Sequence, residues 1–380
     1  MMEAARETHS IVFLHPSDEL YGADRVLLEL VEAVPPGSCV SVWLPNDMEY
    51  GERLLTRELE ARGIAVVRGP LPVLRRANLS IPGLAALIPQ TAHAWARLRR
   101  ERPDLLYVNT SALALMVPTG RAVRSKVVAH AHEHLGGVQG RLLSVLLGAA
   151  NELVVVSEAV RRSLPGWLRS RAEVVHNGFA LPEPTDVEQV GPLRCLLASR
   201  WNAWKGHDSV IKAWGLVERR DIRLIIMGGP PLSGAAIDVP HLVSQLPNRE
   251  TVTIKGESPL VSRELAKADV VLVPSTRPDP LPTIAIEAAA AGRSVVASRI
   301  GGLPEIIEDG VSGWLVTPDA PEEWAAVLES LTRRESRTRG QAAREKYETS
   351  FTRERFRSEI SGLLSGILRG TLNDPAVGPT

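Results

Sequence analysis

Residues 269–298 read DVVLVPSTRPDPLPTIAIEAAAAGRSVVAS, and this stretch decides the fold prediction. It opens with DVVLVPS, an apolar run typical of a strand that is buried on both faces of a parallel sheet. TRPDP predicts a loop, and an alanine-rich helix begins at about Pro282–Thr283, where the absent proline N–H would have had no partner. Gly292 ends this helix, and SVVAS is a second strand. We therefore predict one strand–helix–strand unit with parallel strands.

The same alternation of short β-branched runs and longer amphipathic stretches extends along the chain on both sides. It breaks at 176–192, HNGFALPEPTDVEQVGP, whose proline, glycine and acidic residues are typical of a linker. The predicted fold class is α/β, with two Rossmann-like doubly wound parallel-sheet domains that face each other across a cleft. The predicted segments are an N-terminal domain at 1–185, a C-terminal domain at 190–350, a final helix at 351–370 and a disordered tail at 371–380.

Composition narrows the class of protein. The chain has 380 residues, of which 44% are hydrophobic and 23% charged, as in globular domains. No apolar run approaches the ~20 residues of a membrane-spanning helix, and the N-terminus lacks a signal-peptide pattern. Cys39 and Cys195 stand in separate apolar segments, which argues against a disulfide framework or a cysteine metal site. We expect a cytoplasmic protein.

The net charge of zero conceals a basic region. From Arg68 to Arg171 there are 15 basic residues against 5 acidic ones, a net charge of +10. Trp95, Trp167 and many leucines lie in the same region. One interpretation is a face that contacts anionic lipid at the inner side of the cell membrane, or an anionic acceptor. The alternative is a solvated arginine-rich surface. We predict no nucleic-acid partner.

Ligands of doubly wound sheets bind outside the carboxyl ends of the strands, so the residues that follow each strand are the candidates. After the first strand, HPSDELYGADRVLLEL is not a GxGxxG fingerprint, because Gly22 stands alone. Gly22 would let a ligand approach helix-start amides closely, although a simple turn glycine explains it as well. Asn109, Thr110 and Ser111 follow DLLYV, and predict either a helix cap or polar groups for a sugar.

A histidine cluster follows another strand, in KVVAHAHEHL. Alternation along the strand places His130 and His132 on one face, with Glu133 and His134 next to them. A zinc site is conceivable, but positions two apart on one strand cannot easily surround an ion, and no second ligand cluster is present. We therefore predict no metal. A histidine that hydrogen-bonds a neutral polar ligand fits better, with a neighbouring carboxylate that sets its tautomer.

Basic residues follow the first strand in the second half of the chain, in ASRWNAWKGHDS. Arg200 ends the strand and Lys205 comes five residues later, so both can reach one anionic group such as a diphosphate. A surface salt-bridge role is the alternative for each residue alone. Gly229 and Gly256 follow the next two strands and are predicted to let a base or ribose pass.

The quoted stretch of residues 269–298 can be interpreted in the same way. Amides at the helix start are available to an anion, and the helix dipole favours negative charge there. The backbone positions concerned are Leu281, Pro282, Thr283 and Ile284. Glu287 lies about one turn into the helix, where a carboxylate can accept both hydroxyls of a ribose. Asp279 precedes the helix and can accept hydroxyls of a second ring.

These motifs together resemble the retaining glycosyltransferases of family four, which have the GT-B fold. The donor half is matched by SRWNAWKGHDSVIKAW, ADVVLVPS, DPLPTIAIEAAAAGRSVVAS and GGLPEIIEDGVSGWLV, within residues 195–316. YGADRVLLEL and AHEHL match the first half more loosely. SFTRERFRSEISGLL resembles the family's closing helix, which packs back on the first domain.

The resemblance implies transfer of a hexose-type sugar from a UDP- or GDP-sugar to a glycan, lipid-linked or small-molecule acceptor. It further implies retained anomeric configuration, no cofactor and no metal, an acceptor-binding first domain and a donor-binding second domain. Two alternatives are a nucleotide-sugar epimerase on the same scaffold and a non-catalytic homologue that binds the donor.

The resemblance also assigns roles by position. Arg200 and Lys205 would hold the diphosphate during catalysis, and Glu287 the ribose. Asp279 and His132 would contact the transferred sugar, with Gly22 near the phosphate and the acceptor. Four positions depart from the family pattern. Asp279 and Asp24 each replace a glutamate, Pro282 replaces a glycine, and Tyr21 replaces the first of two glycines.

Overall fold

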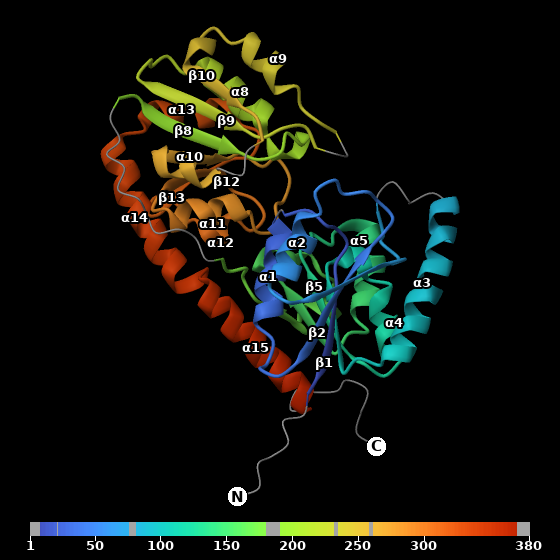
Figure 1. Cartoon of the computed structure of the whole chain (residues 1–380). Coiled ribbons are helices and arrows are strands. Elements are labelled where there is room, and N and C mark those ends of the chain that lie inside the picture. Colours follow the sequence, from blue (N-terminus) through green and yellow to red (C-terminus); the bar gives the residue numbers. More distant parts are fainter. Residues whose placement is uncertain are drawn as a thin grey trace, which may run out of the picture. The chain divides into compact units, whose positions relative to one another are not determined.

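The computed structural model describes residues 8–20, 22–75, 81–179, 191–231, 235–257 and 261–370. The chain forms two compact units, each built on one parallel sheet (Figure 1). Unit 1 comprises Met1–Phe179 and Arg353–Thr380, and unit 2 comprises Ala180–Thr352. The domain boundary predicted between residues 185 and 190, the tail predicted at 371–380 and the Tyr21 position lie outside the described residues.

The sheet of unit 1 has seven parallel strands in the order β3-β2-β1-β4-β5-β6-β7. Its strands are β1 (Ser10–Leu14), β2 (Cys39–Pro45), β3 (Ala65–Gly69), β4 (Leu105–Asn109), β5 (Lys126–Ala131), β6 (Glu152–Val155) and β7 (Ala172–Val174). The central strands β1, β4 and β5 are almost entirely buried, which explains their continuous apolar sequences. The chain leaves β1 toward β2 but leaves β4 toward β5, so the order reverses between β1 and β4.

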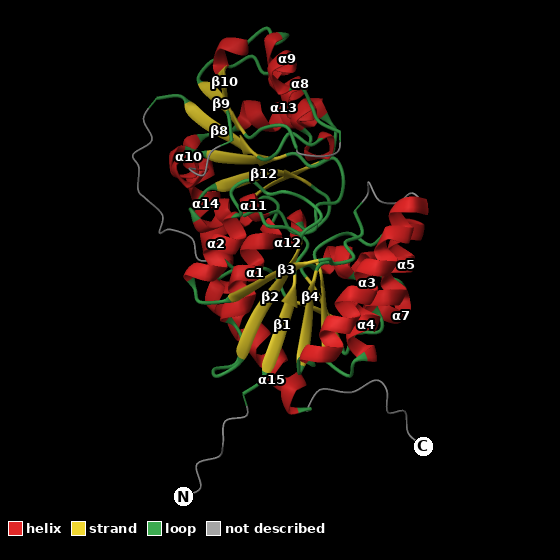
Figure 2. Ribbon diagram, turned by 45° about the vertical axis from the view of Figure 1, so that its right-hand side comes forward, coloured by secondary structure: helices red, strands yellow, loops and turns green. Residues whose placement is uncertain are grey.

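Helices cover both faces of this sheet (Figure 2). They are α1 (Gly22–Glu32), α2 (Leu54–Ala61), α3 (Ile81–Glu101), α4 (Met116–Ala122), α5 (Gly137–Leu147), α6 (Glu158–Ser163) and α7 (Gly166–Arg169). The short η2 helix (Ser111–Leu113) follows β4. Because parallel strands are joined by right-handed crossovers, α1 and α2 pack on one face and α3, α4 and α5 on the other. Among the described helices, none combines the length and apolar character that crossing a bilayer requires.

The last helix, α15 (Arg353–Arg369), belongs to unit 1, as the resemblance predicted. It packs against α1, and the buried carboxylate of Glu29 on α1 pairs with two of its arginines. Nε of Arg353 lies 2.9 Å from Oε2 of Glu29, and Nε of Arg357 donates to the same oxygen at 2.8 Å. Arg355 donates to the carbonyl of His176. These contacts attach the end of the chain to the first domain.

Unit 2 has six parallel strands in the order β10-β9-β8-β11-β12-β13. Its strands are β8 (Leu193–Ala198), β9 (Ile222–Met227), β10 (Val252–Lys255), β11 (Val270–Val273), β12 (Ser294–Ser298) and β13 (Gly313–Val316). Its longer helices are α8 (His207–Leu216), α11 (Thr283–Ala290), α13 (Pro321–Ser330) and α14 (Arg333–Ser350). The shorter ones are η3 (Ala203–Lys205), α9 (Val239–Ser244), η4 (Arg249–Thr251), α10 (Val261–Lys267) and α12 (Leu303–Ile306).

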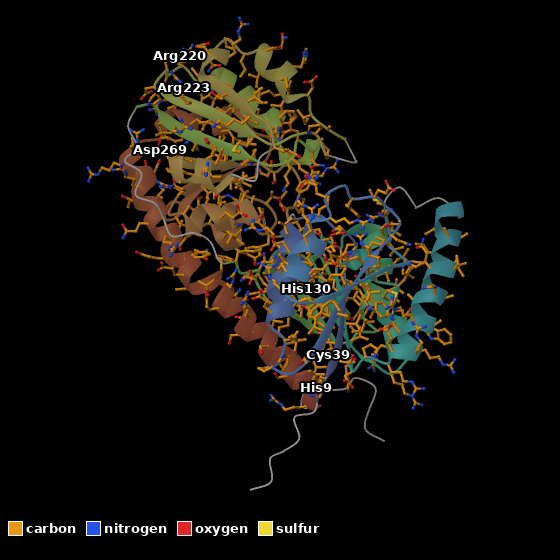
Figure 3. All side chains as sticks on the ribbon, in the orientation of Figure 1. His9, Cys39, His130, Arg220, Arg223 and Asp269 are labelled. Atoms are coloured by element: carbon orange, nitrogen blue, oxygen red, sulfur yellow. The ribbon has the colours of Figure 1, made fainter. Side chains whose placement is uncertain are left out.

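The core of unit 2 is built around two tryptophans. Trp214 of α8 and Trp324 of α13 are both fully buried in one apolar cluster against the sheet. The indole Nε1 of Trp214 donates to Oγ1 of Thr251 at 2.8 Å, so its polar atom is satisfied inside the core. Asp269, labelled in Figure 3, is buried at the start of β11. Its carboxylate accepts from the amide of Arg194 and from Nε of Arg333. That carboxylate links β8, β11 and α14.

Candidate active site

The strand order of unit 2 reverses between β8 and β11, because the chain leaves β8 toward β9 and β11 toward β12. The loops after these two strands are joined directly. The amide of Thr276 donates to the carbonyl of Trp204 at 2.9 Å. Gly206 has φ of 74°, and a Cβ there would lie 1.9 Å from the carbonyl oxygen of Pro274. Only glycine fits this approach, which holds the two loops together at the usual ligand position of such sheets.

An ion pair connects the same loops. Nζ of Lys205 donates to Oδ2 of Asp279 at 2.6 Å and lies 4.2 Å from the ring centroid of Trp204. The Asp279 carboxylate is buried, and Oγ of Ser275 lies 3.4 Å from the same oxygen. The structure thus brings together two residues that were predicted to serve separate groups of a ligand. An ammonium carries three N–H donors, so two remain for an anion after the bond to Asp279.

A second loop fixes the backbone of Asp279. The amide of Gly302 donates to the Asp279 carbonyl at 2.8 Å. Gly301 has φ of 62°, and a Cβ there would lie 2.3 Å from that carbonyl oxygen. A Cβ on Gly302 would lie 2.1 Å from the carbonyl oxygen of Pro280. The Gly-Gly pair that follows β12 is therefore required by packing against the Asp279 loop.

The predicted start of the α11 helix is correct to within one residue. Pro282 is the N-cap, with no side-chain cap hydrogen bond, and Gly292 follows the helix with φ of 66°. Since the first amides of a helix have no intrahelical partner, those of Thr283 and Ile284 remain available to a ligand. Both side chains are partly buried, as is that of Glu287 one turn further, whereas Leu281 is buried.

The other predicted residues of unit 2 lie on neighbouring loops. Arg200 is partly buried directly after β8. The carbonyl of Gly229 accepts from the amide of Trp201 at 2.8 Å, while Gly256 faces open space. The glycine that packing requires is Gly228, which the sequence did not single out. Its φ is 131°, and a Cβ there would lie 2.1 Å from the carbonyl oxygen of Ser199.

A buried histidine lies at the start of α8, just after the loop that carries Lys205. His207 opens α8 and is fully buried, with Nε2 3.4 Å from Oγ of Ser199. Burial, and then the positive charge of Lys205, lower the pKa of His207 to about 4. Its imidazole is therefore neutral at physiological pH and adds no charge to the site.

Unit 1 carries a chain of hydrogen bonds at the corresponding position, between the ends of β1, β4 and β5. Nε2 of His15 lies 2.7 Å from Oδ1 of Asp24, and Oγ of Ser17 donates to that oxygen at 2.6 Å. Nδ2 of Asn109 lies 3.0 Å from Nδ1 of His15. Nε2 of His132 lies 2.8 Å from Oδ1 of Asn109. We call this series of hydrogen-bonded side chains, Asp24–His15–Asn109–His132, the relay.

The relay fixes the tautomers of both histidines. A carboxylate only accepts, so Nε2 of His15 carries its hydrogen and Nδ1 accepts from the Asn109 amide. The amide oxygen of Asn109 then accepts from Nε2–H of His132. Nδ1 of His132 is left with a lone pair, and burial and the nearby His15 lower the pKa of His132 to about 3. His132 is thus a neutral hydrogen-bond acceptor at Nδ1.

The relay corrects two expectations. Glu133 does not set the tautomer of His132, because Asn109 does. The carboxylate of Glu133 accepts from the amide and the hydroxyl of Ser111, at 3.1 and 2.7 Å, and burial raises its pKa. Asn109 is fully buried with both ends of its amide bonded, so it connects the two histidines instead of offering its amide to a sugar.

The neighbouring His130 is part of the core (Figure 3). Its ring lies 4.1 Å from that of His132, on the predicted shared face, and its Nδ1 lies 2.9 Å from the Tyr107 hydroxyl. Within the described residues, no group of three or more His, Cys, Asp or Glu side chains is arranged to hold a metal ion. Gly22 is the first residue of α1.

Sequence reasoning gave no role to His15 or to Ser17, and it named Asp24 only as a departure from the family pattern. The available signal was HPSDELYGAD, in which a histidine comes directly after the first strand and an acid follows Gly22 by two positions. Because these residues meet Asn109 and His132 only through sheet pairing, spacing alone could not connect them.

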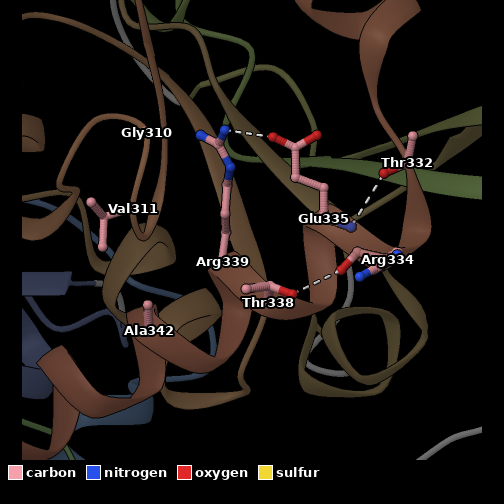
Figure 4. A pocket seen from close by; sticks show the side chains of 8 residues that line it. All are labelled: Gly310, Val311, Thr332, Arg334, Glu335, Thr338, Arg339 and Ala342. Carbon is pink, nitrogen blue, oxygen red and sulfur yellow. Dashed lines mark hydrogen bonds and ion pairs between the residues drawn. The ribbon is translucent and has the colours of Figure 1, made fainter.

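A separate open hollow of about 520 Å³ lies in unit 2 beside the first half of α14 (Figure 4). Its lining includes Gly310 and Val311, which precede β13, so it lies at the amino edge of the sheet. Arg339 is paired there with Glu335 at 2.5 Å and stacks over the ring of Trp314. This hollow is therefore at the edge opposite to the Lys205–Asp279 pair.

Comparison with known proteins gives the family. The family model described as Glycosyltransferase Family 4 matches residues 22–181, and the one described as Glycosyl transferases group 1 matches residues 192–334. The chain belongs to the family 4 glycosyltransferases. The two matches of this family fall in unit 1 and unit 2 respectively and together cover most of the chain.

Two curated relatives within the family are D-inositol 3-phosphate glycosyltransferases. That of Mycolicibacterium gilvum is 35% identical over 186 residues, which are 46% of this chain and 42% of that protein. That of Paenarthrobacter aurescens is 34% identical over 187 residues, which are 44% of this chain and 45% of that protein. The chain therefore matches less than half the length of these relatives.

Solved structures with the same fold cover nearly the whole chain. Anabaena HepE in complex with UDP has a TM-score of 0.78 at 22% identity, covering 94% of this chain and 100% of that one. The sucrose-phosphate synthase of Thermosynechococcus elongatus has a TM-score of 0.75 at 19% identity, covering 95% and 100%. These likenesses show the predicted GT-B fold with its two Rossmann-like domains.

Proposed function

We propose that this protein is a retaining, metal-independent glycosyltransferase that moves a hexose from a UDP-sugar to a hydroxyl acceptor. The observation that carries the proposal is the Lys205 ammonium, held 2.6 Å from Asp279 at the strand-order reversal of unit 2 and next to the start of α11. A cation, a carboxylate and free helix-start amides at one point suit the junction between a diphosphate and a sugar.

The diphosphate would be held by Lys205, Arg200 and the amides at the start of α11. The two remaining N–H donors of Lys205 can reach phosphate oxygens while the third stays on Asp279. The helix dipole adds positive potential at Thr283 and Ile284. Glu287, one turn into α11, is then positioned for the ribose hydroxyls. Asp279 would accept hydroxyls of the sugar with the carboxylate oxygen that Lys205 leaves unused.

The choice of UDP rests on the fold relatives. HepE has been solved with UDP and also with UDP-glucose, the latter at a TM-score of 0.75 to this chain. Base contacts in such sites come largely from backbone, so a GDP-sugar is the natural second donor to test. The loops of Gly228, Gly229 and Gly256 supply that backbone.

The chemical task is to stabilise the charge that develops on the departing phosphate. Lys205, Arg200 and the α11 amides place positive charge there before the reaction starts, which lowers the barrier without a metal ion. Retention would follow from same-face attack, in which the departing phosphate takes the proton of the acceptor hydroxyl. Asp279 is a poor candidate for a covalent intermediate, because its carboxylate is already paired with Lys205.

Within unit 1, the relay is the proposed place where hydroxyls of the sugar bind. Nδ1 of His132, kept unprotonated by the relay, accepts a hydrogen bond from a hydroxyl of the sugar. A neutral acceptor is suited to that task, because an imidazolium would instead attract the diphosphate. The acceptor is proposed to be a hydroxyl-bearing glycan, lipid-linked or small molecule that binds near the start of α1 at Gly22.

Calorimetric titration with UDP, GDP, UDP-glucose and GDP-mannose tests the donor. We expect binding of the uridine compounds, with UDP-glucose bound more tightly than UDP. Absence of binding by every nucleotide would contradict the proposal. Incubation with the bound donor, with and without acceptor sugars and with and without EDTA, then tests the reaction. Conversion of the donor to an epimer without acceptor would indicate an epimerase, and binding without any conversion a non-catalytic homologue.

A further inference from the structure

Exposed apolar side chains are concentrated on one side of unit 1. Eleven large hydrophobic side chains of the described residues are exposed, and seven of them lie on α3, α5 and α7. The six on the two longer helices are Leu84, Ile88, Trp95, Val138, Leu142 and Val145. A monomer normally scatters such residues singly, so their gathering on three helices calls for a covering partner.

The six side chains form two helical stripes. Val138, Leu142 and Val145 on α5 are spaced by four and three residues, and each is 64–75% exposed. Leu84, Ile88 and Trp95 on α3 are spaced by four and seven residues, and Ile88 is 71% exposed. Such spacings place each set on one helix face, opposite the face that packs on the sheet.

The stripes belong to one surface. α4 contacts both α3 and α5, so the two helices lie on either side of it on the same face of the sheet. The ring of Trp167 on α7 lies against Gly148 at the end of α5. Figure 2 shows α3, α5 and α7 together on one side of unit 1. We call this the α3–α5 surface.

The charges on the α3–α5 surface are positive. α5 contains no acid, and its one charged residue, Arg141, is exposed and makes no ion pair with any described residue. The only acid of α3 is Glu101, which Arg97 pairs with at 2.7 Å. Arg99 lies 5.3 Å over the ring of Trp95 in the same helix. An apolar stripe flanked by arginines, whose one acid, Glu101, is already paired with an arginine, is the pattern of a helix that lies in a lipid interface.

We propose that the α3–α5 surface docks on an anionic lipid bilayer. The apolar stripes would enter the boundary between headgroups and acyl chains, and the arginines would contact lipid phosphates. Pairing with a second copy of the chain is disfavoured, because a two-fold interface would bring the same unpaired arginines of both copies together.

The surface also adjoins the relay. Val138 comes six residues after His132, and Gly140 packs so closely on Leu135 that a Cβ would lie 2.0 Å from its carbonyl oxygen. The loop that carries His132 is thus held against the first turn of α5. If the proposed transfer holds, a bilayer on α5 brings lipid-linked acceptors next to His132, and this last step alone rests on the proposed function.

Co-sedimentation with vesicles tests the docking without any activity measurement. The wild-type chain is compared on phosphatidylcholine vesicles and on vesicles with 30% phosphatidylglycerol, at low and high salt. The surface variant is Ile88→Glu with Leu142→Glu. The matched control is Leu216→Glu with Val311→Glu, which changes two exposed apolar residues of unit 2 by the same charge. Thermal unfolding shows that each variant is folded, and light scattering gives its oligomeric state.

We expect the wild type and the control to bind the anionic vesicles, and the surface variant to bind at least tenfold less. Arg99→Gln with Arg141→Gln should lower binding to anionic vesicles alone. Equal binding to both kinds of vesicle, or equal binding by the surface variant, would overturn the proposal. So would a wild-type dimer that the surface variant converts to monomer while vesicle binding is absent throughout.

Discussion

In both units, polar side chains lie at the carboxyl edge of a parallel sheet, where the strand order reverses. The two sites differ in charge. In unit 2 the pair Lys205–Asp279 carries full charges and is reached by solvent on the lysine side. In unit 1 the relay ends in His132, whose pKa of about 3 keeps it neutral. A charged edge suits the diphosphate, whereas a neutral acceptor suits sugar hydroxyls that must not compete with it.

The largest effect should come from removing the cation of unit 2. Lys205→Ala is expected to lower kcat by 10²-fold or more, about the loss of one preorganised electrostatic stabiliser, and Arg200→Ala should behave similarly. Initial rates with UDP-glucose give the comparison. Lys212→Ala, an exposed lysine of α8, is the matched control and should be unaffected. Near-normal turnover of Lys205→Ala would remove the diphosphate role.

The contrast between the units also explains what the sequence could predict. Within residues 269–298, the helix start and the second strand were placed within a residue, because a proline, an alanine run and an apolar run each favour one local structure. The first strand, predicted as DVVLVPS, ends at Val273, two residues before its predicted end. Arg200, Lys205 and Asp279 were recognised as candidates because charged residues after strands are conspicuous.

The partnerships of these residues were not predictable. Lys205 meets Asp279 only because β8 and β11 are neighbours in the order β10-β9-β8-β11, which local pattern does not specify. The relay depends still more on topology, since it joins the ends of β1, β4 and β5 with the start of α1. His15 or Asn109 beside a strand looks like an ordinary core residue until its partners are known.

Each unit holds a neutral histidine, buried in unit 2 and partly buried in unit 1, so both should lose stability in acid. The unfolded histidine has a pKa of about 6.5, against about 4 for His207 and about 3 for His132 in the fold. Between those values the unfolded chain binds protons that the folded one does not, so the free energy of unfolding falls as pH falls. From pH 6.5 to 5 each histidine should contribute a loss of about 2 kcal/mol.

Thermal unfolding between pH 7.5 and 5 measures this loss for each unit. His207→Asn should flatten the pH dependence of unit 2, while His241→Asn, an exposed histidine of α9, should not. An unchanged slope in His207→Asn would show that its neutral state is not what acid disrupts.

A substitution at Asp24, the relay residue farthest from His132, should change the function of unit 1 alone. Asp24→Asn removes the negative charge of the acceptor that keeps hydrogen on Nε2 of His15, and a charge-assisted hydrogen bond is worth about 1.5–3 kcal/mol. Because the effect passes through Asn109 to His132, we expect kcat to fall about tenfold, at the low end of that range. UDP affinity should stay the same, because the proposed diphosphate site lies in unit 2.

Steady-state kinetics and calorimetry on one preparation separate these readouts. Asp104→Asn, an exposed acid of unit 1, serves as control. Asp24→Glu should recover part of kcat, because it restores a charged acceptor. Weaker UDP binding in Asp24→Asn, or no change in kcat, would contradict a positioning role for the relay.

Asp279→Asn tests the shared carboxylate of unit 2. Removing its charge frees Lys205 and takes a negative group away from the diphosphate, so UDP should bind as well as before or more tightly. The sugar would lose its charged hydroxyl acceptor, so the extra affinity of UDP-glucose over UDP should shrink about tenfold. Calorimetry with the two ligands gives the ratio directly. A parallel loss for both ligands would mean that Asp279 serves only to hold Lys205.

The smallest predicted effect on UDP binding concerns Gly256, which resembles Gly228 in sequence because both glycines follow a strand of unit 2. Gly256 faces open space, so Gly256→Ala should leave the fold intact and weaken UDP binding by about fivefold or less, through a single methyl in the path of the nucleotide. Gly228→Ala should instead lower the melting temperature, because its Cβ would lie 2.1 Å from the Ser199 carbonyl oxygen. If Gly256→Ala binds UDP normally, the nucleotide does not pass the loop after β10.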